Sequence, residues 1–97
     1  MKIPYRFTSK VWQYKGAGGW HFISLPKQLS AEIRETFQRE EEAWGRLTAT
    51  AQIGNSEWST AIWFDTKLNT YLLPLKSEIR KKENLHVNKV VKATVYI

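Results

Sequence analysis

The chain has 97 residues and a formal net charge of +6, with 42% hydrophobic and 13% aromatic residues and five tryptophans. This length suits one domain, residues 1–97, with a single hydrophobic core, and it is too short for a second domain that would close a cleft. The sequence contains no cysteine, which excludes disulfides, thiolate metal sites and cysteine nucleophiles, and which suits a reducing compartment such as the cytoplasm.

The predicted elements begin with a strand over residues 5–14, in which apolar and polar side chains alternate. Residues 15–19 hold three glycines and interrupt the pattern, and residues 20–25 resume it, which predicts a hairpin. A phosphate-binding glycine loop would instead open a helix, so we interpret the glycines as a turn. We expect His21 at the surface or rim of its strand rather than as a metal ligand.

A short amphipathic helix is predicted next, because Leu29, Ile33 and Phe37 recur at every fourth position. Ser30 is the candidate N-cap of this helix. The glutamate run 40–42 follows the helix. Consecutive carboxylates in a polar connection are expected to stay ionised and solvated rather than to form a catalytic pair.

The predicted elements that follow are mostly strands. Residues 44–53 alternate regularly, and the residues expected to face the core are Leu47, Ala49, Ala51 and Ile53. Two small alanines on the inner face are typical of a tightly curved sheet. The remaining predicted elements are strands over residues 58–64, 71–75 and 90–97 and a helix over residues 76–84 capped by Ser77.

An internal repeat links the two halves. Leu25-Pro26 and Leu73-Pro74 each precede a predicted helix, and an alternating strand follows each helix, at residues 49–53 and 93–97. The sequence therefore predicts a mainly β (β-rich α+β) fold, a small closed six-stranded barrel of two pseudo-repeated strand-helix-strand halves. Because one chain carries both halves, we expect a monomer.

Catalytic and metal-binding patterns are weak in this sequence. The chain has one aspartate, and His21 and His86 are its only histidines and show no ligand spacing. No segment approaches the roughly 18 apolar residues of a membrane span, and the N-terminus has no signal-peptide-like apolar run. We expect a non-enzymatic binding domain without metal or cofactor, neither exported nor inserted in a membrane.

The positive charge is concentrated near the predicted second helix. Residues 76–92 hold six lysines and arginines against two glutamates, a net charge of +4. The candidate binding residues for an anionic partner, either nucleic acid or an acidic protein, are Lys76, Arg80, Lys81 and Lys82. The alternative interpretation is a solvated helix face that keeps the protein soluble.

A second candidate site is an exposed aromatic patch made of Trp20, Trp58 and Trp63, which would bind a protein or a small ligand. Trp58 and Trp63 lie an odd number of residues apart on one predicted strand, so they point to opposite faces. At least one of the two is therefore a candidate for exposure.

Several short motifs occur in a characteristic order along the chain: Gly19-Trp20, Phe22, Leu25-Pro26, Trp44-Gly45, Gly54, Trp58-Ser59-Thr60, Tyr71-Leu72-Leu73-Pro74, Lys76, Arg80 and Leu85. With these, residues 5–97 resemble a bacterial family of uncharacterised proteins, the domain of unknown function DUF1905. The resemblance implies a small barrel similar to the double-split β-barrel of AbrB-like transition regulators, and no established activity.

The chain departs from this family pattern at three places. Asn88-Lys89 stands where Gly-Asp is usual, and because Asn tolerates the left-handed conformation, the turn is retained while the acid is lost. Thr60-Ala61 and Trp63-Phe64 stand where Thr-Ser and Phe-Pro are common. A function that needs that Ser or Asp is not expected here.

Overall fold

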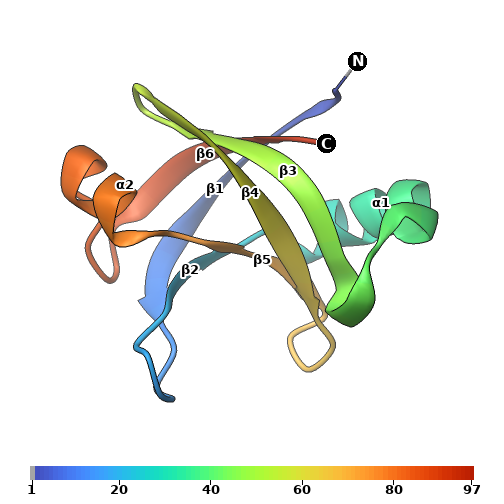
Figure 1. The fold of residues 1–97 in the computed structure, drawn as a ribbon, viewed down its shortest axis with the longest axis horizontal. Coiled ribbons are helices and arrows are strands. Elements are labelled where there is room, and N and C mark those ends of the chain that lie inside the picture. Colours follow the sequence, from blue (N-terminus) through green and yellow to red (C-terminus); the bar gives the residue numbers. More distant parts are fainter. Residues whose placement is uncertain (1) are drawn as a thin grey trace.

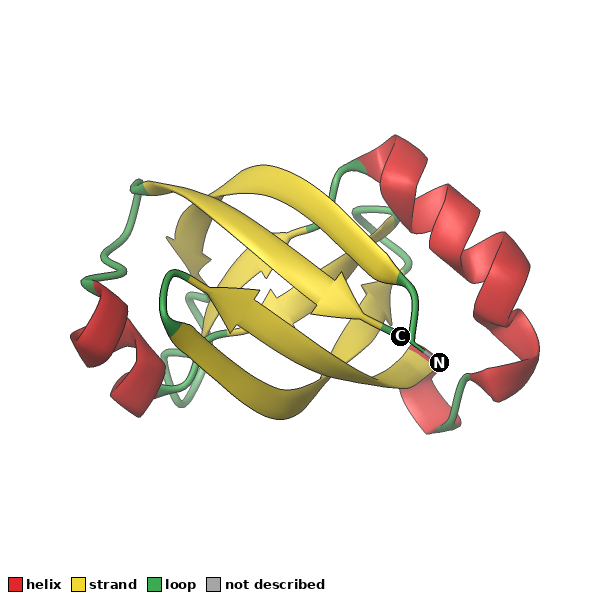
Figure 2. Ribbon diagram, turned by 90° about the horizontal axis from the view of Figure 1, so that it is seen from above, coloured by secondary structure: helices red, strands yellow, loops and turns green. Residues whose placement is uncertain are grey.

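The computed structural model describes residues 2–97, whose six strands close into one barrel with a helix at each end (Figures 1 and 2). The strands are β1 (Pro4–Gln13), β2 (His21–Ser24), β3 (Arg46–Ile53), β4 (Ser56–Asp65), β5 (Thr70–Pro74) and β6 (Val90–Tyr96). The helices are α1 (Lys27–Phe37) and α2 (Ser77–Glu83), and the short 3-10 turns η1 (Gln38–Glu40) and η2 (Ala43–Gly45) follow α1. Neighbours in the order β1-β2-β5-β4-β3-β6 are antiparallel. The predicted mainly β fold with a closed six-stranded barrel is confirmed.

The two halves of the barrel are related by a pseudo-twofold axis. Exchanging β1 with β4, β2 with β5 and β3 with β6 leaves the strand order unchanged. On one side Ile23 pairs with Leu73, 50 residues away, and on the other Ala51 pairs with Val95, 44 residues away. The sequence separation between paired residues falls from 50 to 44 because the connection through α1 is longer than the connection through α2.

The Leu-Pro part of the predicted repeat is two residues out of register. The Leu25 amide donates to the Tyr71 carbonyl at 2.9 Å, and the Leu75 amide donates to the His21 carbonyl at 2.9 Å. The helices that follow begin at Lys27 and Ser77, which are 50 residues apart, so Leu25 is the counterpart of Leu75 and not of Leu73. The strand parts of the repeat, residues 49–53 and 93–97, lie side by side in the barrel, with Ala51 opposite Val95.

The core lies inside the barrel, and the predicted inward residues of β3 are all buried: Leu47, Ala49, Ala51 and Ile53. Ala51 pairs directly with Trp58 of β4, which is also buried. Residues paired across an antiparallel ladder share one face of the sheet. The small alanine therefore leaves room for an indole inside a narrow barrel.

The predicted bounds of the strands and of α2 agree with the structure to within two residues, but both predicted helix caps are wrong. Helix α1 begins at Lys27, so Ser30 lies inside it and is fully buried. The Ser30 hydroxyl donates to the Leu25 carbonyl at 3.3 Å and accepts from the Tyr71 amide at 3.0 Å. Ser77 is the first residue of α2, which has no side-chain cap bond.

The glutamate run after α1 is not uniformly solvated, which corrects the expectation for residues 40–42. The Glu41 carboxylate accepts a hydrogen bond from the Tyr71 hydroxyl and lies 3.7 Å from the Arg34 guanidinium. Arg34 also lies over the Phe64 ring, 3.8 Å from its centre. Burial, followed by the hydrogen bond and the negative charge of Glu41, raises the pKa of Tyr71. These contacts attach α1 to the end of the barrel.

The turn between β3 and β4 gives a testable consequence at Gly54, whose φ is +58°. A Cβ there would lie 2.0 Å from Oε1 of Glu83, whose carboxylate accepts a hydrogen bond from the Ser56 hydroxyl at 2.6 Å. Because both the backbone strain and the displaced carboxylate cost stability, Gly54→Ala should lower the free energy of unfolding by about 1–3 kcal/mol. Urea denaturation measures this. In a Glu83→Ala background, Gly54→Ala should lower the free energy of unfolding only by the cost of backbone strain. A loss as large as in the wild type would contradict the contact between residue 54 and the Glu83 carboxylate.

Candidate ligand groove

Four neighbouring strands, β1, β2, β5 and β4, present apolar side chains to the outside of the barrel. Trp12 of β1 pairs with Phe22 of β2, and Phe22 pairs in turn with Pro74 of β5. Leu72 of β5 pairs with Trp63 of β4. Because paired residues of antiparallel strands point to the same face, this register assembles one outward surface from segments far apart in the sequence.

The aromatic rings on this surface are packed against one another. The Trp12 and Phe22 ring centres are 5.1 Å apart, and Trp20 lies nearly parallel to Phe22, at 6.3 Å and 13°. The Trp12 indole donates to the Ser24 hydroxyl at 2.9 Å. The Tyr14 amide donates to the Trp20 carbonyl at 2.8 Å, which fixes the base of the glycine turn. Trp20 nevertheless keeps 59% of its surface exposed.

Together these side chains line a groove of about 620 Å³, here called the aromatic groove: Trp12, Tyr14, Trp20, Phe22, Trp63, Asp65, Lys67, Leu68, Leu72 and Pro74. This volume is within the range of ligand pockets in proteins. Asp65 is the single acidic lining residue, and its Oδ1 accepts from the amides of Lys67 and Leu68 at 2.8 and 3.0 Å. The aromatic groove is thus mainly apolar, and its one cationic lining residue is the exposed Lys67.

A smaller hollow of about 200 Å³ adjoins the aromatic groove. It shares Trp20 and Pro74 with the groove, and Trp58 and Lys76 also line it. Lys76 immediately precedes α2. The aromatic groove therefore continues across Trp20 toward the start of the basic helix.

The structure divides the predicted aromatic patch. Trp20 and Trp63 line the aromatic groove and are 59% and 37% exposed, but Trp58 is only 7% exposed and belongs to the core. Trp58 is therefore removed from the predicted exposed patch. Trp12 takes its place, and its position on the outward phase of β1 with Lys10 is the signal that could have found it.

The four predicted cations differ in burial and in what they contact. Lys76 is exposed and lines the smaller hollow, and Lys81 and Lys82 are exposed on α2. Arg80 is half-buried, and its Nε donates to the Leu75 carbonyl at 3.1 Å. Successive helix residues are about 100° apart, so Arg80, Lys81 and Lys82 point in different directions. Of the four, only Lys76 lies beside the aromatic residues.

Other candidate chemistry is sparse within residues 2–97. No group of three or more histidine, aspartate or glutamate side chains comes together there in a way that could hold a metal ion. No helix in the same range is long and apolar enough to cross a membrane. His21 is half-buried, which is compatible with the expected rim position, and its buried Nδ1 has no hydrogen-bond partner within residues 2–97.

The family model described as domain of unknown function (DUF1905) matches residues 7–95 of the chain. No curated protein matches the sequence. The match covers all six strands of the barrel in whole or in part, and both of its helices.

Proposed function

We propose that this chain, which belongs to the family of the domain of unknown function DUF1905, is a non-enzymatic module that binds single-stranded nucleic acid. The resemblance predicted from the ordered motifs is confirmed, but the family description carries no activity. The observation that supports the proposal is the aromatic groove, which keeps indole faces exposed and continues to Lys76 in a chain of net charge +6.

Base stacking is the first contribution. Unpaired bases stack on aromatic side chains with about 1–3 kcal/mol per base, and every base offers a flat face. Trp20 and Trp63 are the two exposed tryptophans of the aromatic groove. Leu72 and Pro74 separate them along the groove floor. Two bases can therefore be held by stacking without sequence-specific hydrogen bonds.

Electrostatic attraction is the second contribution. Three exposed lysines surround the aromatic residues: Lys67 in the groove, Lys76 in the adjoining hollow, and Lys10 two residues before Trp12 on the same outward phase of β1. Asp65 opposes them, but its Oδ1 already accepts two backbone hydrogen bonds. The balance of charge at the groove thus favours an anionic partner, and a phosphate backbone is the one that also brings bases for stacking.

A second candidate function is supported by the apolar floor of the groove, which Phe22, Leu68, Leu72 and Pro74 form. Aromatic-lined grooves also bind extended, proline-rich peptides, whose recognition depends little on charge. The two functions differ in their salt dependence, so one titration separates them.

The test is a fluorescence-anisotropy titration against labelled single-stranded DNA and RNA at about 50 and 200 mM salt. With three phosphate contacts, from Lys10, Lys67 and Lys76, the affinity for a single strand should fall roughly 20-fold between the two salt concentrations. Duplex DNA should bind more weakly, because its bases are not free to stack. No binding at the lower salt concentration would refute the proposal, and salt-independent binding of a proline-rich peptide would favour the second function.

We propose further that the protein acts as a cytoplasmic monomer. The pseudo-twofold barrel is complete within one chain, so no second copy is needed to close it. A cysteine-free sequence suits a reducing compartment.

A further inference from the structure

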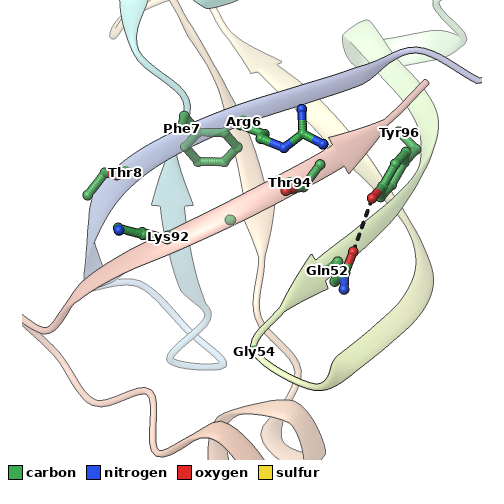
Figure 3. Close-up of a pocket in the computed structure, with 9 residues that line it drawn as sticks. Arg6, Phe7, Thr8, Gln52, Gly54, Lys92, Thr94 and Tyr96 are labelled. Carbon is green, nitrogen blue, oxygen red and sulfur yellow. Dashed lines mark hydrogen bonds between the residues drawn. The ribbon is translucent and has the colours of Figure 1, made fainter.

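A second hollow lies on the outer face of β1, β6 and β3, away from the residues that line the aromatic groove. It has a volume of about 410 Å³, and we call it the cationic hollow. Figure 3 shows its polar side chains: Arg6, Thr8, Gln52, Lys92, Thr94 and Tyr96. No carboxylate lines it, and it shares no lining residue with the aromatic groove.

The strand register places Arg6 and Lys92 on adjacent strands at this hollow, and in the conformation of Figure 3 their charged ends extend in opposite directions. Arg6 pairs with Thr94, and Thr8 pairs with Lys92, so Arg6 and Lys92 are diagonal neighbours on adjacent strands. The Cα atoms of diagonal neighbours in a sheet are about 7–8 Å apart, a spacing that long, flexible side chains can span to reach one ligand. Neither Arg6 nor Lys92 forms an ion pair or a side-chain hydrogen bond with another residue in the range 2–97.

The acidic residues near this face do not neutralise the pair. Glu57 pairs with Gln52 but belongs to β4, on the far side of β3 from Arg6. Glu83 lies beside Gly54, and its carboxylate accepts a hydrogen bond from the Ser56 hydroxyl. The Gln52 side chain is engaged as well, since its Oε1 accepts from the Tyr96 hydroxyl at 3.1 Å (Figure 3). Arg6 and Lys92 are both exposed, so their charged groups are accessible to an external anion.

We propose that the cationic hollow binds a phosphate group between Arg6 and Lys92. A guanidinium can hold two phosphate oxygens with paired hydrogen bonds, and an ammonium adds a compact charge. The hydroxyls of Thr8 and Thr94 lie on the same face and can donate to a remaining oxygen. The phosphate can belong to a nucleic-acid backbone or to a free phosphate ester. The hollow requires no aromatic stacking, so the site is independent of the function proposed for the aromatic groove.

The test is a titration of ¹⁵N-labelled protein with inorganic pyrophosphate, followed by amide chemical shifts. Saturable shifts should be confined to residues 6–8 and 92–94. The double variant Arg6→Gln/Lys92→Gln should bind at least about tenfold more weakly, because it loses two charge-assisted contacts. Thr94→Glu, which places a carboxylate in the hollow, should abolish the shifts.

A matched control removes the same charge elsewhere. Lys27→Gln/Lys81→Gln replaces two exposed lysines, one at the start of α1 and one in α2. This variant should keep the wild-type affinity for pyrophosphate to within about twofold. Equal weakening in both double variants, or shifts spread over the whole lysine-bearing surface, would overturn the site. A dispersed amide spectrum for each variant ensures that loss of binding is not loss of fold.

A second arm identifies the source of the phosphate. An oligonucleotide of about eight nucleotides is added to a Trp20→Ala/Trp63→Ala variant, in which the aromatic groove is disabled. Shifts at residues 6–8 and 92–94 that pyrophosphate reverses would assign the hollow to a nucleic-acid backbone. Shifts with pyrophosphate alone would assign it to a free phosphate ester.

Discussion

Replacing Trp20 and Trp63 together by alanine is expected to weaken the binding of single-stranded DNA or RNA by at least about 30-fold. Each indole would supply one stacking platform, worth about 1–3 kcal/mol, and every 1.4 kcal/mol is a factor of ten in affinity. Both side chains are on the barrel exterior and are 59% and 37% exposed, so their loss leaves the core intact. Anisotropy titration at about 50 mM salt measures the change, with the wild-type protein as reference.

Trp44→Ala is the matched control for this variant. Trp44 lies in η2, is 86% exposed, and does not line the aromatic groove. Its removal takes away the same indole chemistry from another place on the surface, and we expect it to change the affinity less than twofold. If Trp44→Ala weakens binding as much as the double variant does, the aromatic groove is not the binding site.

The dependence of affinity on salt concentration, here called the salt slope, separates the stacking contribution from the charge contribution in the same experiment. The double variant should keep the wild-type slope, since Lys10, Lys67 and Lys76 are unchanged. A Lys67→Gln/Lys76→Gln variant should instead lower the slope while the stacking contribution stays. A double tryptophan variant whose slope collapses as well would show that the bases and the backbone are not bound by independent groups.

The inward face of the barrel could be predicted from the sequence because it depends on a local period. Alternation along residues 47–53 fixes which side chains of β3 face the core, whatever strands lie beside it. The same rule put Trp58 and Trp63 on opposite faces, and the structure confirms that one is buried and the other exposed.

The aromatic groove could not be predicted in the same way, since it depends on which strands are neighbours. Trp12, Phe22 and Pro74 come from β1, β2 and β5, and only the closed order of the barrel brings them into one row. The alternation of apolar and polar residues indicates which side chains share a face of a strand, but it does not indicate which strand pairs with that strand. A count of charges has a similar limit, because Arg80, Lys81 and Lys82 are consecutive on a helix and so point apart.

Local rules failed where a distant partner decided the outcome. Ser30 has the residue type of an N-cap, but its hydroxyl bonds the amide of Tyr71, 41 residues further along the chain. Glu41 belongs to a charged run, but the hydroxyl of the same tyrosine binds it. Tyr71 therefore joins β5, α1 and the connection after α1, which is information that no window of the sequence contains.

Tyr71→Ala is accordingly expected to lower the free energy of unfolding by about 3–5 kcal/mol. The ring is fully buried and meets Phe64 edge-on, with ring centres 5.0 Å apart, so its removal leaves a cavity at the end of the barrel. A domain of this size has a total stability of about 5–15 kcal/mol, so the loss is a large fraction of it. Urea denaturation measures the change, and a loss below about 1 kcal/mol would contradict the central position of this side chain.

Tyr71→Phe isolates the hydroxyl and adds a pH dependence whose sign is fixed. The variant keeps the ring but leaves the Glu41 carboxylate with Arg34 alone, which should cost about 1–3 kcal/mol at neutral pH. In the wild type the pKa of Tyr71 is raised in the folded state, so above pH 10 the unfolded chain loses a proton that the folded chain keeps. Wild-type stability then falls with rising pH, while the phenylalanine variant lacks this contribution. The difference between the two proteins should therefore shrink as the pH rises above about 10, and a constant difference would show that the hydroxyl is not held protonated by burial and by Glu41.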